Sequence, residues 1–162
     1  MPNNSPTLSA RQRAGGFTLI ELMVTVLVLV ILVTMAAPSM SQFIASQRAR
    51  NAAADLASAV TLTRSEAVNR NATITMTASA SSWTGGWTVA AGTTKVRGYG
   101  PYDGIAITAS GGSSLTVGND GRPTSGSQTF QVAPSSSAGA NTTLCVQVSG
   151  TGRVATVNGA CT

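Results

Sequence analysis

Apolar residues run almost without a break from Phe17 to Ala37, after a polar leader. A helix that crosses the hydrocarbon core of a bilayer needs about 20 such residues, so this run is long enough for one span. Glu21 is the only charged residue inside it. The pattern predicts a membrane helix over residues 17–37 that carries a single acid near its start.

The pattern then becomes amphipathic, and small or apolar residues recur at steps of three or four. These positions are Ala49, Ala53, Leu56, Val60, Thr63 and Ala67. They predict that the helix continues over residues 38–71 and packs one face against a sheet. Pro38 lies inside this long helix and is expected to kink it, because proline removes a hydrogen bond and its ring clashes with the carbonyl of Thr34.

Beyond the helix the sequence alternates with a period of two and is broken by Gly and Ser, which indicates short strands. The expected strands are 72–77, 86–91, 105–109, 115–117, 129–132, 143–148 and 153–157, with serine-rich loops at 79–82, 110–114 and 135–137. The chain is therefore expected to be α+β: a long N-terminal helix packed on an antiparallel sheet or small sandwich, with a β-rich head at residues 72–162.

The acid in the apolar run needs a physical reason, because a carboxylate inside a membrane costs at least ~2.5 kcal/mol. One reason is that Glu21 snorkels to the interface. A second is a counter-charge. Cleavage between Gly16 and Phe17 would leave a free ammonium group on Phe17, one helical turn from Glu21.

The stretch Gly15-Gly16-Phe17-Thr18-Leu19-Ile20-Glu21 resembles the N-terminus of type IV pilins and type II secretion pseudopilins. The resemblance implies the type IV pilin fold and a prepilin peptidase that cuts after Gly16, removes the leader 1–16 and methylates Phe17. It also implies that Glu21 pairs with the Phe17 amine of a neighbouring subunit during assembly. Opposite charges about 4 Å apart attract by roughly 4 kcal/mol at an effective dielectric constant near 20, before desolvation.

An ordinary secretory signal is the competing interpretation, since residues 34–37 form a small-residue sequence of the kind that signal peptidases cut. That cleavage would discard Glu21. In either case Arg11 and Arg13 predict a cytoplasmic N-terminus by the positive-inside rule. The expected location is the inner membrane, crossed once with the head in the periplasm, and then a pilus or pseudopilus.

Two parts of the expected head resemble FimT/GspH-like minor pilins and pseudopilins. Residues 63–67 (Thr-Arg-Ser-Glu-Ala) and 86–89 (Gly-Trp-Thr-Val) match the first half of that branch, and residues 119–122 (Asn-Asp-Gly-Arg) with Gly152-Arg153 match the second. The resemblance thus extends over nearly the whole chain.

The formal net charge is +5, and removal of Arg11 and Arg13 leaves eight Lys or Arg against five Asp or Glu. This mild basic bias permits weak contact with polyanions. DNA-binding FimT-like pilins carry a Gly-Arg-x-Arg motif, and here the matching stretch ends in Ala155 in place of the second arginine. The candidate DNA-contacting residues are Arg153, Arg122, Lys95 and Arg97.

Cys145 and Cys161 both follow the span and are expected to form a disulfide in an oxidising periplasm, worth about 3 kcal/mol in the chain-entropy model. The chain has no histidine, and it has no P-loop and no Gly-x-Gly-x-x-Gly segment in a βαβ setting. Asp103 and Asp120 precede glycines, as aspartates in tight turns do. No enzyme activity, cofactor or metal is expected.

The residues and the resemblance favour a minor pilin that initiates or caps a type IV pilus through contacts alone. The alternatives are a GspH-type minor pseudopilin of a type II secretion system and a FimT-like DNA receptor for natural transformation. The expected partners are other minor and major pilins or pseudopilins, the prepilin peptidase, the inner membrane and, in the last case, DNA.

Overall fold

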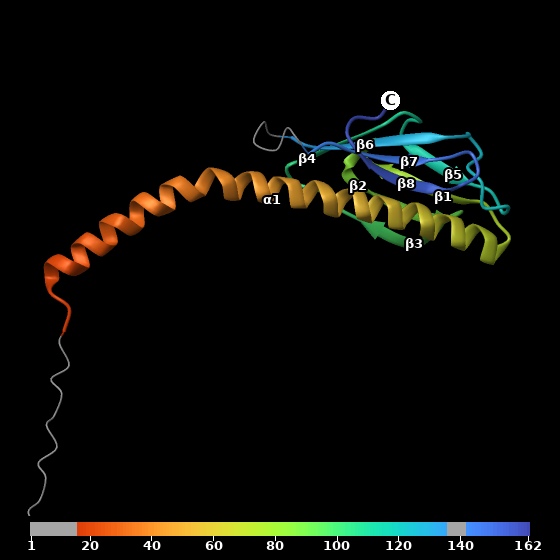
Figure 1. Cartoon of the computed structure of the whole chain (residues 1–162). Coiled ribbons are helices and arrows are strands. Elements are labelled where there is room, and N and C mark those ends of the chain that lie inside the picture. Colours follow the sequence, from red (N-terminus) through yellow and green to blue (C-terminus); the bar gives the residue numbers. More distant parts are fainter. Residues whose placement is uncertain (1–15, 136–141) are drawn as a thin grey trace, which may run out of the picture. The chain divides into compact units, whose positions relative to one another are not determined.

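The computed structural model describes residues 16–135 and 142–162, apart from the side chains of residues 36–38. Arg11, Arg13 and most of the third serine-rich segment lie outside the described residues. One helix, α1 (Leu19–Arg70), precedes eight strands (Figure 1). The strands are β1 (Ile74–Ser79), β2 (Ser82–Ala91), β3 (Thr94–Tyr99), β4 (Ile105–Ala109), β5 (Ser114–Val117), β6 (Gln128–Pro134), β7 (Leu144–Val148) and β8 (Val154–Asn158). The chain forms two compact units, residues 1–37 and 38–162, and each is described by itself.

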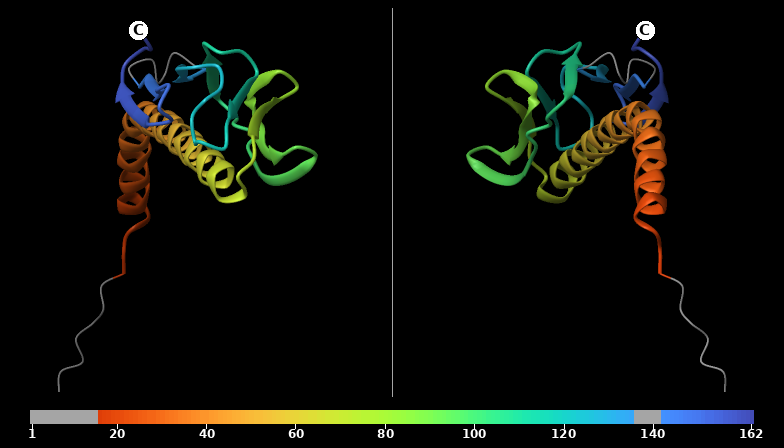
Figure 2. Two further views of the ribbon diagram at one scale, coloured as in Figure 1. Left: turned by 90° about the vertical axis from the view of Figure 1, so that its right-hand side faces the viewer. Right: turned by 90° about the vertical axis from the view of Figure 1, so that its left-hand side faces the viewer.

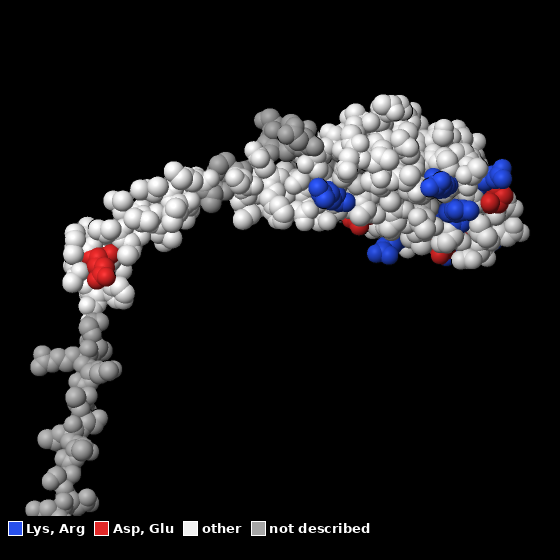
Figure 3. Space-filling model, viewed as in Figure 1, with Lys and Arg blue, Asp and Glu red and all other residues white. Residues whose placement is uncertain are grey.

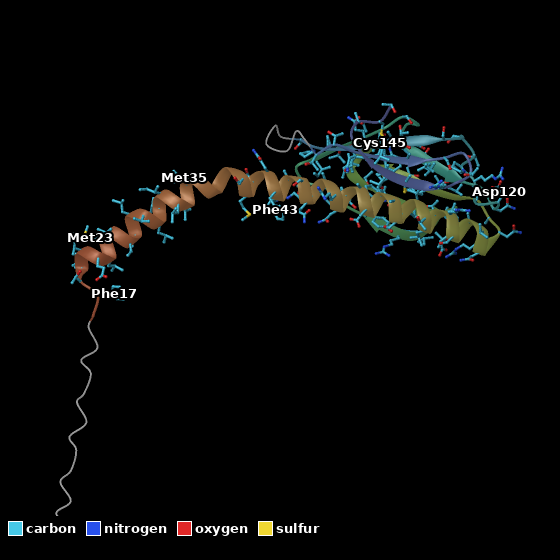
Figure 4. The ribbon with its side chains drawn as sticks, viewed as in Figure 1. Phe17, Met23, Met35, Phe43, Asp120 and Cys145 are labelled. Atoms are coloured by element: carbon cyan, nitrogen blue, oxygen red, sulfur yellow. A yellow bond between two sulfur atoms is a disulfide. The ribbon has the colours of Figure 1, made fainter. Side chains whose placement is uncertain are left out.

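In the first unit α1 starts immediately after Thr18, which caps it. The Glu21 amide donates to the Thr18 hydroxyl at 3.3 Å, and the Leu22 amide donates to the Thr18 carbonyl at 3.1 Å. The side chains of residues 19–35 are exposed on every face of the helix, and Figure 4 labels Met23 and Met35 among them. A helix that is apolar all round suits hydrocarbon surroundings better than water.

No single helix of the described residues meets the length and hydropathy requirements for crossing a membrane. The pair Leu19–Met35 and Ser39–Arg70 meets them when the two are taken together. The kink predicted at Pro38 falls on a residue whose side chain is outside the described part, so it remains a prediction.

In the second unit the face of α1 that was predicted to pack against a sheet is indeed buried. All six predicted positions, Ala49, Ala53, Leu56, Val60, Thr63 and Ala67, are at most 1% exposed. Ala52 and Ala59 are also buried, so the buried face is wider than the predicted stripe. The Thr63 hydroxyl donates to the Ala59 carbonyl at 2.7 Å, which satisfies this buried polar group within the helix.

The head contains two four-stranded antiparallel sheets, in the orders β3-β2-β1-β5 and β4-β6-β7-β8. Their inner faces and the buried face of α1 share one core. The expected α+β architecture, a long N-terminal helix followed by antiparallel sheets, is therefore confirmed. In both views of Figure 2 the dark-blue strand β8 forms an outer edge of the head.

The sequence prediction was wrong about the number of strands and about β2. Eight strands form, where the alternating pattern predicted seven, and β2 begins at Ser82 instead of Gly86. Only Ala80 and Ser81 turn the chain between β1 and β2, and both have positive φ. Trp83 and Trp87 of β2 are 3% and 1% exposed. Glycine lowers the strand propensity of this segment, and the burial of the two large aromatic side chains compensates for it.

Candidate functional site

The expected cleavage junction lies in an accessible, non-helical segment. Gly16, Phe17 and Thr18 precede the first residue of α1, and the Phe17 side chain is 82% exposed. A Cβ placed on Gly16 would meet no atom within 4 Å. A peptidase needs a backbone that is free of helix and strand hydrogen bonds, and Gly16 and Phe17 lie outside any helix or strand.

Glu21 stands at the third position of α1 and is exposed. Figure 3 shows it as the one acidic side chain among the described residues of the first unit, surrounded by uncharged atoms. Among those residues no ion pair involves it. The spacing Thr18-x-x-Glu21 is that of a capping box, a local signal that the sequence reasoning missed. Charge at a helix N-terminus contributes about 0.3–1 kcal/mol, which is less than the cost of placing the carboxylate in a membrane.

The second group of candidate residues lies where α1 ends in the head. Gly121 and Gly152 have φ of 75° and 78°, and a Cβ on Gly152 would collide with the carbonyl oxygen of Gly121. A Cβ on Gly121 would stand 3.2 Å from Nε of Arg64. The two loops and Arg64 are therefore in contact. Arg64 was not among the candidate DNA-contacting residues predicted from the sequence.

Arg122 and Arg153 follow these two glycines, so three arginines come from segments that meet at one end of the head. Figure 3 shows basic side chains gathered there. Figure 4 labels Asp120 at the same end, where its Oδ2 lies 4.0 Å from Nε of Arg122. Arg153 also lines a groove of about 510 Å³ on the outer face of the second sheet, together with Thr129.

Lys95 and Arg97 do not join this group. They lie on β3, at the opposite edge of its sheet from β5, and three strand spacings amount to about 14 Å. The Arg97 guanidinium lies over the ring of Tyr99, 5.1 Å from its centre. The four candidate DNA-contacting residues thus occupy two separate parts of the head.

A stack of aromatic rings connects the head to α1. Trp87 stacks on both Tyr99 and Tyr102, with ring centres 5.5 and 5.0 Å away and interplanar angles of 21° and 14°. The Tyr102 hydroxyl donates to Oδ2 of Asp55 on α1 at 3.0 Å. Burial, and secondly this hydrogen bond, raise the pKa of Tyr102 above its ordinary value.

The C-terminal segment is attached to the second sheet by the predicted disulfide. Cys145 and Cys161 are bonded, with their Cα atoms 5.1 Å apart (Figure 4 labels Cys145). The Gly159 amide donates to the Thr143 carbonyl at 2.8 Å, and the Cys161 amide donates to Oε1 of Gln131 at 3.3 Å. The tail therefore follows the outer face of the sheet, and Cys145 is fully buried beneath it.

Two family models match this chain. Residues 52–152 match the model described as type II transport protein GspH, and residues 11–37 match the prokaryotic N-terminal methylation motif. No curated protein gives a significant match.

Two crystal structures of the type IV minor pilin FimU from Pseudomonas aeruginosa are similar in fold, each with a TM-score of 0.58. One is 20% identical and matches over 65% of this chain and 85% of FimU; the other is 19% identical and matches over 67% and 91%. At this identity the likeness concerns the fold. The GspH model covers more than half of the sequence and the methylation motif covers its apolar start, so this chain belongs to the GspH family of minor pilins and pseudopilins.

Proposed function

We propose that this protein is a minor pilin that initiates or caps a type IV pilus at the inner membrane. The observation that carries the proposal is the isolated carboxylate of Glu21, one turn from an exposed cleavage junction and at the start of a helix that is apolar on every face. Cleavage after Gly16 creates the Phe17 ammonium group. The Glu21 carboxylate of one subunit then attracts the Phe17 ammonium of its neighbour and brings the two helices into register.

The same proposal sets the topology. Arg11 and Arg13 hold the leader on the cytoplasmic side, residues 17–37 cross the inner membrane, and the head lies in the periplasm. The disulfide between Cys145 and Cys161 supports this placement, because such bonds persist in oxidising compartments. The protein acts through contacts, without chemistry of its own.

Replacement of Gly16 by leucine tests the processing step. A bulky side chain at the residue before the scissile bond should block the peptidase, so the chain should keep residues 1–16, stay in the membrane fraction and be absent from sheared pili. The measurement is the intact mass, which for the wild-type chain should correspond to a methylated Phe17 at the N-terminus. Thr18→Ser, which keeps the helix cap, is the matched control. Uncleaved chains in pili would contradict the proposal.

The pseudopilin alternative uses the same membrane segment and differs in the fibre that is built. The family model that matches is named for a type II transport protein. Fractionation decides between the two: recovery from sheared pili supports the pilus, whereas loss of protein secretion on deletion, with pili intact, supports the pseudopilus.

DNA contact is a second candidate function, favoured by the meeting of Arg64, Arg122 and Arg153 at one end of the head. Phosphate contacts of this kind are salt-dependent, and three arginines support only weak binding. In a gel shift with the full mature chain in detergent micelles, Arg153→Ala should weaken retardation at low salt several-fold, and Lys95→Ala should leave it unchanged. If both variants retarded the DNA equally, or if the wild-type chain did not retard it, DNA binding through these arginines would be ruled out.

A further inference from the structure

The two sheets of the head have four outer strands, and the structure protects three of them against pairing with another chain. A free strand edge is a template for β-pairing, which proteins prevent with covering segments, charges or irregularities. At β5 the Thr124 amide donates to the Thr116 carbonyl at 2.9 Å, and Pro123 bridges to Val117. At β4 the Ile107 amide donates to the Thr84 hydroxyl at 3.0 Å. The turn around Pro123 thus covers the edge of β5, and β2, which carries Thr84, lies beside the edge of β4.

The edge of β3 is protected by charge and by irregular geometry. This strand carries Lys95 and Arg97, and its register with β2 shifts between Val89 and Ala90. Lysine, arginine and a bulge are all features that oppose edge-to-edge pairing. Three of the four edges are thus closed within the described head.

The fourth edge, β8, has none of these features. It pairs only with β7, in an unbroken register from Val148↔Val154 to Leu144↔Asn158. Its five residues include no charge and no proline. Thr156, Val157 and Asn158 are exposed, Val157 by 42%.

The hydrogen bonds at the two ends of β8 show which backbone groups face outward. The Ser149 amide donates to the Arg153 carbonyl, and the Gly159 amide donates to the Thr143 carbonyl. In an antiparallel pair, hydrogen-bonded positions alternate with non-bonded ones. Ala155 and Val157 therefore bond to β7, whereas the N–H and C=O groups of Val154, Thr156 and Asn158 point away from it. Among the described residues no hydrogen bond reaches these outward groups.

We propose that β8 is an assembly edge that pairs, strand to strand, with an extended, uncharged segment of a neighbouring pilin subunit. The proposal rests on the proposed function as a pilin, and it assigns a docking strand to the head in addition to the membrane helix. The outward groups of Val154, Thr156 and Asn158 each supply one donor and one acceptor. Val157 supplies exposed apolar surface, which favours an apolar side chain on the partner where the two strands meet.

Amide hydrogen exchange tests the pairing directly. The mature full chain is compared in detergent micelles, alone and after co-expression with the other pilins of its own system. Alone, the amides of Val154, Thr156 and Asn158 should exchange fast and those of Ala155 and Val157 slowly. In the co-expressed complex the first set should slow at least tenfold. Unchanged exchange of that set in the complex would overturn the proposal.

Proline substitution tests the edge in cells. Thr156→Pro removes an outward N–H and no bond to β7, and proline is tolerated on the open side of an edge strand. This variant should fold and form its disulfide but be recovered from sheared fibres at least tenfold less than the wild type. Thr156→Ala, which keeps the N–H, should be recovered normally. Normal recovery of Thr156→Pro would overturn the proposal.

The outcomes separate this proposal from the one it rests on. Absence of the wild-type chain from sheared fibres would overturn the proposed function and the docking strand together. Presence of the wild-type chain with an unprotected β8 would overturn the docking strand alone. Slow exchange of the outward amides in the chain purified alone, with dimers in the micelles, would assign the edge to a second copy of this chain and overturn the choice of partner.

Discussion

Replacement of Glu21 by glutamine is expected to remove the protein from assembled fibres and leave its head folded. The side chain keeps its size and loses its charge, so the proposed attraction between Glu21 and the Phe17 ammonium of the next subunit is lost. At about 4 Å and an effective dielectric constant near 20 this attraction is roughly 4 kcal/mol before desolvation. A net loss of about 1.4 kcal/mol already lowers incorporation tenfold. The measurement is the amount of the chain in sheared fibres relative to the membrane fraction.

Thr25→Ala is the matched control for this variant. Thr25 lies one turn further along the same exposed face of α1, and its hydroxyl donates only to the Leu22 carbonyl of the same helix, at 2.8 Å. Its loss should leave incorporation unchanged. The head is monitored by its disulfide, which should form in both variants. Incorporation of the Glu21→Gln chain at the wild-type level would refute the pairing of carboxylate and ammonium.

Replacement of Trp87 by alanine is expected to give the largest loss of stability in the head. The side chain is 1% exposed and stacks on Tyr99 and Tyr102, so its removal leaves a cavity that neither ring fills. Substitutions of this kind cost about 3–5 kcal/mol. A domain is stable by about 5–15 kcal/mol in total, so the variant should be near its folding limit. Urea unfolding of the mature chain in micelles, followed by circular dichroism, measures the loss.

Trp87→Phe is the control for the aromatic stack. It retains a ring against the two tyrosines, and it removes an indole N–H that is buried without a hydrogen-bond partner among the described residues. Removal of an unpaired buried donor is favourable, and this gain offsets part of the lost packing. The phenylalanine variant should therefore be clearly more stable than the alanine variant. Equal stability of the two would show that the stack contributes little.

The sequence alone was sufficient to predict the parts of this molecule that depend on local periodicity or on covalent chemistry. The helical spacing of Ala49 to Ala67 identified the buried face, because side chains three or four apart share one side of a helix. Cys145 and Cys161 identified the disulfide because no other cysteine was available to either. The motif around Gly16 and Glu21 pointed to the family that the comparisons show.

The sequence could not predict features that depend on contacts between distant segments. Ser82 to Gly86 has the composition of a loop, and it is a strand because Trp83 and Trp87 are buried. The segments that carry Arg64, Arg122 and Arg153 meet only because two glycine turns, far apart in the chain, pack against each other. The open edge of β8 follows from the order of the strands within a sheet, which no local pattern records.

The disulfide also determines when, during maturation, the C-terminal residues become covalently attached to the head. Until Cys145 and Cys161 meet an oxidant, residues after β8 are held only by backbone and side-chain hydrogen bonds such as those from Gly159 and Cys161. The cytosol keeps thiols reduced, so in a chain that is still in the cytosol the C-terminal residues lack this covalent attachment. If the head is exported to the periplasm as proposed, the bridge closes only after translocation, and subunits whose cysteines stay reduced differ from oxidised ones in how their last four residues are held.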